Sequence, residues 1–259
     1  MKWILNIHLT KEAAKFDIKN FDSRVFPKET VQKGKIMNRN DLTITALYDL
    51  SQTMAADLLA KYTYPWEALA EIGSFILELG STLSEEEYEL RGENVWVHKT
   101  AKVAVNVCIQ GPTIIGKEAE IRPCAYIRGK AIVGEGAVIG NSCELKNAII
   151  FNKAQIPHFN YVGDSILGYK AHMGGGSMTS NLKSDKSLVV IKTDEEQIET
   201  GLKKVGAMLG DYAEVGAGAV MNPGTVVGRN ANIYPLSMVR GTIPANSIYK
   251  KAGEIVAKR

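Results

Sequence analysis

The sequence carries a repeat of six residues that runs from Val97 to Val239. Nine aliphatic residues stand six apart at Val97, Val103, Ile109, Ile115, Ile121, Ile127, Val133, Ile139 and Leu145. After one-residue slips, the rule resumes at Ile150, Ile156 and Val162, then at Leu167 and Met173, and again from Leu209 to Val239. A helix repeats near 3.6 residues and a simple strand near two, so neither period explains the pattern.

A period of six suits a short strand followed by a tight turn, stacked many times. Each strand would turn one aliphatic side chain inward, and glycines such as Gly116 and Gly134 tolerate the sharp corners between strands. One rung cannot bury its own core, so the rungs must stack. A run of ordinary short strands in a barrel or sandwich is the weaker alternative, because the turns between such strands do not recur at a constant spacing. The array resembles the hexapeptide-repeat proteins, which implies an all-β solenoid, a left-handed parallel β-helix, and a homotrimer.

The repeat divides the chain of 259 residues into three parts. Residues 1–94 are an N-terminal extension, in which aliphatic spacing predicts a helical hairpin over about 41–80 that serves as a cap or oligomer contact. Residues 95–245 form the predicted β-helix. Within it, residues 182–206 lack the repeat and should form an inserted loop, a place where solenoids often carry function. Residues 246–259 should leave the β-helix as a short cationic tail.

The net charge and the lengths of the apolar runs argue against nucleic-acid and membrane partners. The net charge is +3, and no basic stripe with interleaved aromatics indicates nucleic-acid binding. No apolar run approaches the roughly 20 residues that span a bilayer, and the N-terminus lacks a secretion signal, so we expect a cytoplasmic protein. Cys108, Cys124 and Cys143 have no metal-binding spacing, and we expect them to be small buried fillers in a reducing compartment.

The densest group of polar residues lies between positions 144 and 186, where the repeat slips. It contains the run PHFNYVGD at 157–164, then GGG at 174–176 and TSN at 179–181. His158 is the natural general base at neutral pH, although a lone histidine is more often structural. Tyr161 lies three residues further on and Glu144 lies in an earlier rung, which favours a catalytic role for His158.

Three runs in this region resemble one enzyme family, namely Glu144-Leu145-Lys146, PHFNYVGDSILG and GGGSMTSN. The family is the acetyltransferase half of the bifunctional UDP-N-acetylglucosamine pyrophosphorylase/glucosamine-1-phosphate acetyltransferases and related archaeal sugar-1-phosphate nucleotidylyltransferases. The resemblance covers roughly residues 95–245. It implies an acetyl-CoA-dependent N-acetyltransferase that acts on an amino sugar phosphate or a nucleotide-linked amino sugar, without a metal. Residues 1–95 lack the Gly-rich loop of the family's nucleotidyltransferase domain, so we expect no pyrophosphorylase activity.

The resemblance also implies a role for each residue of the site. The catalytic residues would be His158 as the general base, Glu144 to orient its imidazole, and Asn181 to hold the acetyl end of acetyl-CoA. The substrate-binding residues would be Arg128, Lys146, Tyr161, His172, Lys183 and Lys186. Acetyl-CoA would also contact Gly175 and Ala217. Arg128 and Lys146 would hold phosphate, which is the chemistry that cationic side chains suit.

Two departures from the family concern the acceptor. His172 stands where the family has an asparagine, and Ser187 stands where it has a lysine, so that Lys183 or Lys186 would have to serve. One alternative is therefore a non-catalytic trimeric protein that binds sugar nucleotides or acts as a scaffold. A metal-dependent hydratase needs three convergent histidines, and the array offers only His98, His158 and His172 with no pair five apart.

Overall fold

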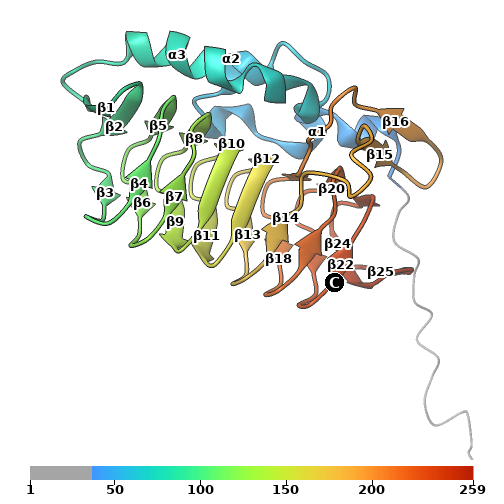
Figure 1. Ribbon diagram of the computed structural model, residues 1–259. Coiled ribbons are helices and arrows are strands. Elements are labelled where there is room, and N and C mark those ends of the chain that lie inside the picture. The colour runs from blue at the N-terminus through green and yellow to red at the C-terminus, as the bar shows by residue number, and fades with distance from the viewer. Residues whose placement is uncertain (1–36, 259) are drawn as a thin grey trace, which may run out of the picture. The chain divides into compact units, whose positions relative to one another are not determined.

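The computed structural model describes residues 37–258, which form a parallel β-helix with short helices lying along one of its faces (Figure 1). This confirms the fold that the six-residue repeat predicts. The part of the expected N-terminal extension before residue 37 lies outside the described residues. Among residues 37–258, no helix is long and apolar enough to cross a membrane.

The strands stack coil upon coil on three faces. The first face contains β2 (Val95–His98), β5 (Thr113–Ile115), β8 (Ala131–Val133), β17 (Ala207–Leu209), β20 (Thr225–Val227) and β23 (Thr242–Ile243). The second face contains β4 (Cys108–Ile109), β7 (Tyr126–Ile127), β14 (Met178–Thr179), β19 (Val220–Met221) and β22 (Met238–Val239). The third face contains β3 (Lys102–Val103), β6 (Glu120–Ile121), β9 (Val138–Asn141), β11 (Gln155–His158), β13 (His172–Met173), β18 (Glu214–Val215), β21 (Asn232–Ile233) and β24 (Ser247–Lys251). Two longer strands, β10 (Glu144–Ile150) and β12 (Tyr161–Leu167), cross from the second face to the first.

The repeated aliphatic residues fill the interior of the β-helix. Val97, Ile115 and Val133 stand in register on successive coils and are fully buried. Small alanines such as Ala119 and Ala137 are buried in the same core. One aliphatic residue per short strand is therefore enough to build a continuous core, since each coil covers its neighbours.

An antiparallel hairpin covers one face at each end of the stack. At the N-terminal end, β1 (Tyr88–Gly92) pairs antiparallel with β2. At the other end, β25 (Glu254–Ala257) pairs antiparallel with β24. The expectation of a departing tail over 246–259 is wrong, because β24 stacks in parallel on β21 and places Tyr249 in the core. The aliphatic rule missed this coil because the inward residue is aromatic.

Residues 37–83, which we call the N-terminal segment, form short helices in place of the expected hairpin. They are η2 (Arg39–Leu42), α1 (Ile44–Leu47), η3 (Leu50–Gln52), α2 (Ala56–Leu59), η4 (Pro65–Ala70) and α3 (Ile72–Thr82), where η denotes a 3-10 helix. The first three each begin at a side chain that caps a new turn, at Asn38, Thr43 and Asp49. Such residues favour helix starts over helix interiors, so the expected first helix is split.

The N-terminal segment covers the first face of the β-helix (Figure 1) and forms a second hydrophobic core there. The first face contributes outward-facing residues that are fully buried, at Ile114, Ile132, Ile149, Ile166, Met208 and Val226. The segment contributes buried residues such as Leu58, Trp66, Ile72 and Ile76. Each of these outward residues directly precedes an inward residue in the sequence. Two consecutive apolar residues in a short strand therefore indicate that the outer side of that face is covered as well.

Asp211 fastens the N-terminal segment to the coils. Its side chain is fully buried, and its carboxylate accepts hydrogen bonds from the backbone N–H of Asp49 at 2.7 Å and of Tyr169 at 2.8 Å. Arg229 completes the set with an ion pair of 3.0 Å. Burial raises the pKa of Asp211 above the usual carboxyl value. One carboxylate thus joins the segment to two separate coils.

The insertion at 182–206 is more ordered than the expected loop. It contains an antiparallel hairpin of β15 (Val190–Lys192) and β16 (Gln197–Glu199). Val189 and Ile191 are fully buried in the second hydrophobic core. Arg39 of the N-terminal segment makes a two-pronged ion pair with Glu196 at the hairpin turn.

The cysteines differ from the expectation of three buried fillers. Cys143 is buried in the core, and burial raises the pKa of its thiol. Cys108 and Cys124 are exposed. Cys108 directly precedes the inward Ile109, which turns it outward, and Cys124 lies at a corner with a positive φ. Periodicity fixes the inward residue of each strand but says nothing of a small residue beside it.

Candidate active site

The two slips of the repeat shorten one corner of the β-helix. Leu145 to Ile150 and Val162 to Leu167 are steps of five, and there β10 and β12 pass from the second face to the first as unbroken strands. Asn147 and Asp164 lie opposite one another at this bend, and both adopt left-handed backbone conformations with φ of 48° and 47°. Asparagine and aspartate tolerate that conformation better than most residues.

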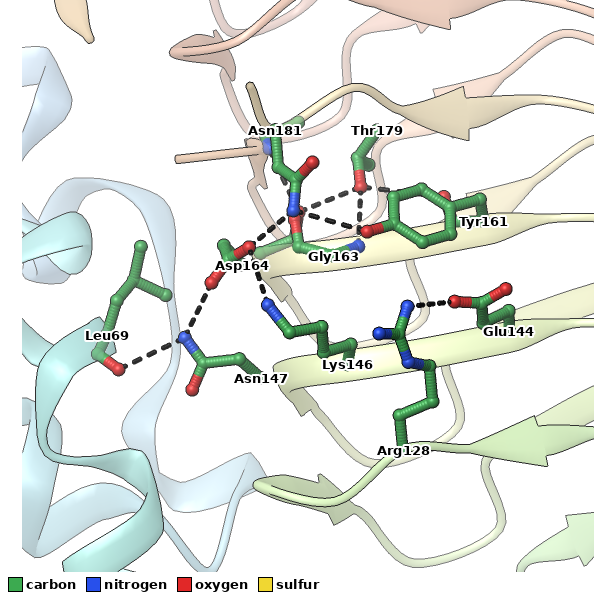
Figure 2. Close-up of polar contacts among 12 residues, drawn as sticks. Leu69, Arg128, Glu144, Lys146, Asn147, Tyr161, Gly163, Asp164, Thr179 and Asn181 are labelled. Atoms are coloured by element: carbon green, nitrogen blue, oxygen red, sulfur yellow. Dashed lines mark hydrogen bonds and ion pairs between the residues drawn. The ribbon is translucent and has the colours of Figure 1, made fainter. Parts of the chain in front are cut away.

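Asp164 is the centre of a polar network at this corner (Figure 2). Its side chain is 8% exposed. Oδ1 accepts a hydrogen bond from Asn147 Nδ2 at 2.9 Å, and Oδ2 accepts one from Asn181 Nδ2 at 2.5 Å. The ammonium of Lys146 lies 3.7 Å from Oδ2. The sequence run PHFNYVGD includes Asp164, but spacing alone gave it no role.

Tyr161 and Gly163 complete the surroundings of Asn181. The Asn181 amide nitrogen lies 3.2 Å from the Tyr161 hydroxyl. A Cβ at position 163 would lie 2.4 Å from that hydroxyl and 2.8 Å from the amide nitrogen, so only glycine fits there. Burial, followed by the charges of Asp164 and Glu144, raises the pKa of Tyr161. Tyr161 therefore remains a neutral hydroxyl at physiological pH.

Glu144 pairs with Arg128 rather than with His158. The distance from Arg128 Nη1 to Glu144 Oε1 is 2.6 Å, and this bond raises the pKa of the guanidinium. Arg128 stands in register with Lys146 on the next coil, since Tyr126 pairs with Glu144 and Ile127 with Leu145. Two predicted phosphate ligands are thus neighbours on the second face. The contact expected between Glu144 and His158 is not formed in this chain.

His158 lies at the end of β11, at the corner between the third and second faces. Its neighbour on the next coil is Gly175, where a Cβ would lie 2.7 Å from His158 Cδ2 and 3.0 Å from Nε2. Ala217 stands beyond Gly175, whose carbonyl accepts a hydrogen bond from the Gly218 N–H at 2.9 Å. Within residues 37–258, the His158 imidazole has no hydrogen-bond partner. The ring nitrogens therefore remain available to a ligand.

If His158 has the catalytic role that the resemblance implies, replacing Gly175 with alanine should lower turnover about tenfold or more, because the new methyl group displaces the His158 ring and small displacements at a reacting group are costly. Gly176→Ala is a matched control. That glycine has a φ of +71° but no heavy atom within 4 Å of an added Cβ. Gly176→Ala should therefore lower the free energy of unfolding by about 1 kcal/mol and leave the His158 ring in place. Initial rates and denaturant unfolding would separate the two effects, and equal turnover in both variants would refute the steric argument.

His172 lies apart from the shortened corner of the β-helix that contains Lys146. It belongs to β13 on the third face, where Nδ1 lies 2.9 Å from a carboxylate oxygen of Glu214. Lys153 and Lys170 line the same shallow recess. Within one chain, the structure does not bring His172 together with Arg128 and Lys146, which face outward from the second face.

The two predicted lysines of the insertion have different surroundings. Lys183 lines a cavity of about 420 Å³ beneath the hairpin, together with Lys192 and Arg240. Lys186 is exposed and does not line this cavity. Lys192 and Arg240 have no acidic partner among the described residues. Sequence reasoning missed both, because they come from segments far from the motif.

A single column of polar residues links this cavity to the Asp164 network. The strand register places Arg128, Lys146, Gly163, Ser180, Asn222 and Arg240 on successive coils along one edge of the second face. Neighbouring strands lie about 4.8 Å apart, so Gly163 and Arg240 are separated by about 14 Å. Cations therefore stand at both ends of an edge whose middle is neutral. No group of three or more potential metal ligands occurs in the part of the chain that the structure describes.

Comparison with known proteins identifies relatives of the chain. The family described as GMPPB C-terminal domain matches residues 109–194. The bifunctional protein GlmU of Methanocaldococcus jannaschii is 31% identical over 267 residues, covering 93% of this chain and 61% of GlmU. YaiX of Escherichia coli K12, named as an acetyltransferase, is 31% identical over 159 residues, covering 61% of this chain and 69% of YaiX.

The chain belongs to the hexapeptide-repeat acetyltransferases. Within that class it is similar to the acetyltransferase half of GlmU and of the archaeal sugar-1-phosphate nucleotidylyltransferase/acetyltransferases. One of these, from Sulfurisphaera tokodaii, is 32% identical over 174 residues, covering 60% of this chain and 43% of that protein. The chain spans about half the length of such bifunctional relatives.

Proposed function

We propose that this protein is an acetyl-CoA-dependent N-acetyltransferase of an amino sugar phosphate or a nucleotide-linked amino sugar, with His158 as the general base. The observation that carries the proposal is the His158 imidazole, which has no hydrogen-bond partner in the described part of the chain and lies against Gly175, at a corner whose next strand begins with Tyr161. The amine nitrogen of the acceptor attacks the thioester carbonyl, so a C–N bond forms and the C–S bond breaks. The amine proton passes to His158, and the leaving thiolate takes up a proton as CoA.

The cationic ends of the polar column suit two anionic substrates. Arg128 and Lys146 would bind the phosphate of the acceptor, although Glu144 already shares the charge of Arg128. Lys192 and Arg240, which lack acidic partners among the described residues, would bind the phosphates of acetyl-CoA at the other end of the column, about 19 Å from Lys146 for Arg240. Asn181 lies between these ends, where the acetyl group would meet the amine.

We further propose that the working unit is a homotrimer with each site between two copies. The predicted site residues lie on different faces, with His172 on the third face and Arg128 and Lys146 on the second. Residues on the third face and on the second face can contribute to one site only if the third face of one copy lies beside the second face of a neighbouring copy. Sedimentation of the purified protein would test the trimer, and a monomer that retains full turnover would refute it.

The proposed activity is tested by measuring CoA-thiol release from acetyl-CoA with a panel of amino sugar 1-phosphates and UDP-linked amino sugars. Release that depends on one acceptor supports the enzyme and names its substrate. If neither CoA release nor acetyl-CoA binding is detected, the proposed enzyme is refuted and a scaffolding role is favoured. Acetyl-CoA binding without release shows an intact donor site and directs the search to other amines.

A further inference from the structure

The N-terminal segment reaches the polar network at a single point. The backbone carbonyl of Leu69, in η4, accepts a hydrogen bond from Asn147 Nδ2 at 3.2 Å, and the same nitrogen donates to Asp164 Oδ1 (Figure 2). We propose that Asp164 and Asn147 are positioning residues, through which the N-terminal segment fixes the side chain of Asn181 for acyl transfer. This inference rests on the proposed function, because it assigns Asn181 to the reacting centre.

The surroundings of Asn147 allow only one orientation of its amide. Both of its partners, the Leu69 carbonyl and the Asp164 carboxylate, are acceptors, so the nitrogen must face them. The Asn147 Oδ1 atom is consequently buried without a hydrogen-bond partner in the part of the protein that the structure describes. An unsatisfied buried oxygen carries a cost in folding free energy, and such exceptions call for an explanation. Here the explanation is that Asn147 links η4 to Asp164.

The Leu69 carbonyl is itself held in place. Leu69 and its neighbours Trp66 and Ile72 are buried in the core between the N-terminal segment and the first face. Close packing of this kind restricts the backbone far more than an exposed loop would. Asn147 therefore ties Asp164 to a fixed point outside the β-helix.

Asp164 passes this restraint to Asn181. An ionised carboxylate can only accept, so its Oδ2 selects the amide nitrogen of Asn181 rather than the oxygen. The Tyr161 hydroxyl contacts the same nitrogen. The Asn181 Oδ1 atom is left without a partner among residues 37–258, and Figure 2 shows it directed away from Asp164. The restraint thus presents an acceptor oxygen to the N–H groups of a bound amine or amide.

The test replaces Asn147 with glycine, which tolerates its φ of 48° and removes only the link. We expect Asn147→Gly to lower kcat for CoA release about tenfold or more, with KM for both substrates within about twofold. Asn230→Gly is the matched control. Asn230 also has a positive φ, at 55°, and its side chain also makes two hydrogen bonds, but these lie at the C-terminal end of the stack. The control should keep the wild-type kcat.

A double-mutant cycle and an activity-independent signal complete the test. Asn147→Gly should have little further effect in an Asp164→Asn background, because both residues act through one chain of bonds. Hydrogen exchange of the Asn181 side-chain amide, measured by NMR and assigned with Asn181→Asp, should be faster in Asn147→Gly than in the wild type. Unchanged kcat, additive effects, or unchanged exchange would each overturn the proposal. If the wild type neither releases CoA nor binds acetyl-CoA, the proposed function fails, and the exchange measurement alone still decides whether Asn147 restrains Asn181.

Discussion

Replacing His158 with alanine should lower kcat/KM for CoA release by about two to four orders of magnitude, the usual contribution of a positioned general base. The side chain lies at a corner of the β-helix and makes no hydrogen bond within the described residues, so its removal should leave the fold intact. The measurement is the initial rate of CoA release with the acceptor identified by the panel, compared between His158→Ala and the wild type.

Two controls decide how the result is interpreted. Denaturant unfolding and sedimentation should be the same for His158→Ala as for the wild type, which separates a chemical role from a structural one. Full activity in a folded His158→Ala variant would refute the mechanism. Asn230→Gly provides a variant from a distant coil that should behave as the wild type in every assay.

Replacing Asp211 with alanine should lower the free energy of unfolding by roughly 3 kcal/mol. The backbone N–H groups of Asp49 and Tyr169 would lose their acceptor, and each donor left unsatisfied costs about 1–3 kcal/mol. Denaturant unfolding followed by tryptophan fluorescence is suitable, because Trp66 of the N-terminal segment is buried in the core that the segment shares with the first face. Asp194 is the matched control, because its side chain is exposed and makes no hydrogen bond or ion pair with any residue from 37 to 258. Asp194→Ala should change stability by about 0.5 kcal/mol or less. Equal stability of the two variants would refute the role of Asp211 as a fastener.

The pH dependence of stability should also identify Asp211. Because burial raises its pKa in the folded state, the folded protein binds more protons than the unfolded chain between the unfolded pKa, near 3.9, and the raised folded value. The free energy of unfolding of the wild type should therefore fall, relative to Asp211→Asn, as pH rises through that window. Parallel curves for the two proteins would show that Asp211 does not titrate as its burial implies.

Much of the β-helix could be predicted because its physics is local. An aliphatic residue at every sixth position, as at Ile115 and Val133, can be recognised in the sequence without any knowledge of the fold. The N-terminal segment was harder to predict because its short helices depend on caps and on packing against Ile132 and Ile149. The last coil escaped notice because Tyr249 replaces the aliphatic residue.

The candidate site could be predicted in its composition but not in its connections. Residues such as His158, Lys146 and Asn181 stand in recognisable runs of sequence, and their roles remain predictions. Which carboxylate meets which cation depends on strand register, and the register puts Arg128 rather than His158 beside Glu144. Asp164 and Asn147 gained their importance only once the shortened corner placed them opposite one another.

The two terminal hairpins have a consequence for assembly. A stack of parallel strands with bare ends would act as a template for another stack, and copies could grow into filaments. Here β1 and β25 run against the direction of the coils, and both carry charged side chains. Glu89 pairs with Arg91 within β1, and Glu254 of β25 pairs with Lys250 of β24. The other faces of the described stack end in β3, β4, β22 and β23, which are two residues long, and strands this short offer little ladder to a second copy. Growth along the axis is thereby disfavoured, and association is directed to the sides of the β-helix, where a finite, closed oligomer can form.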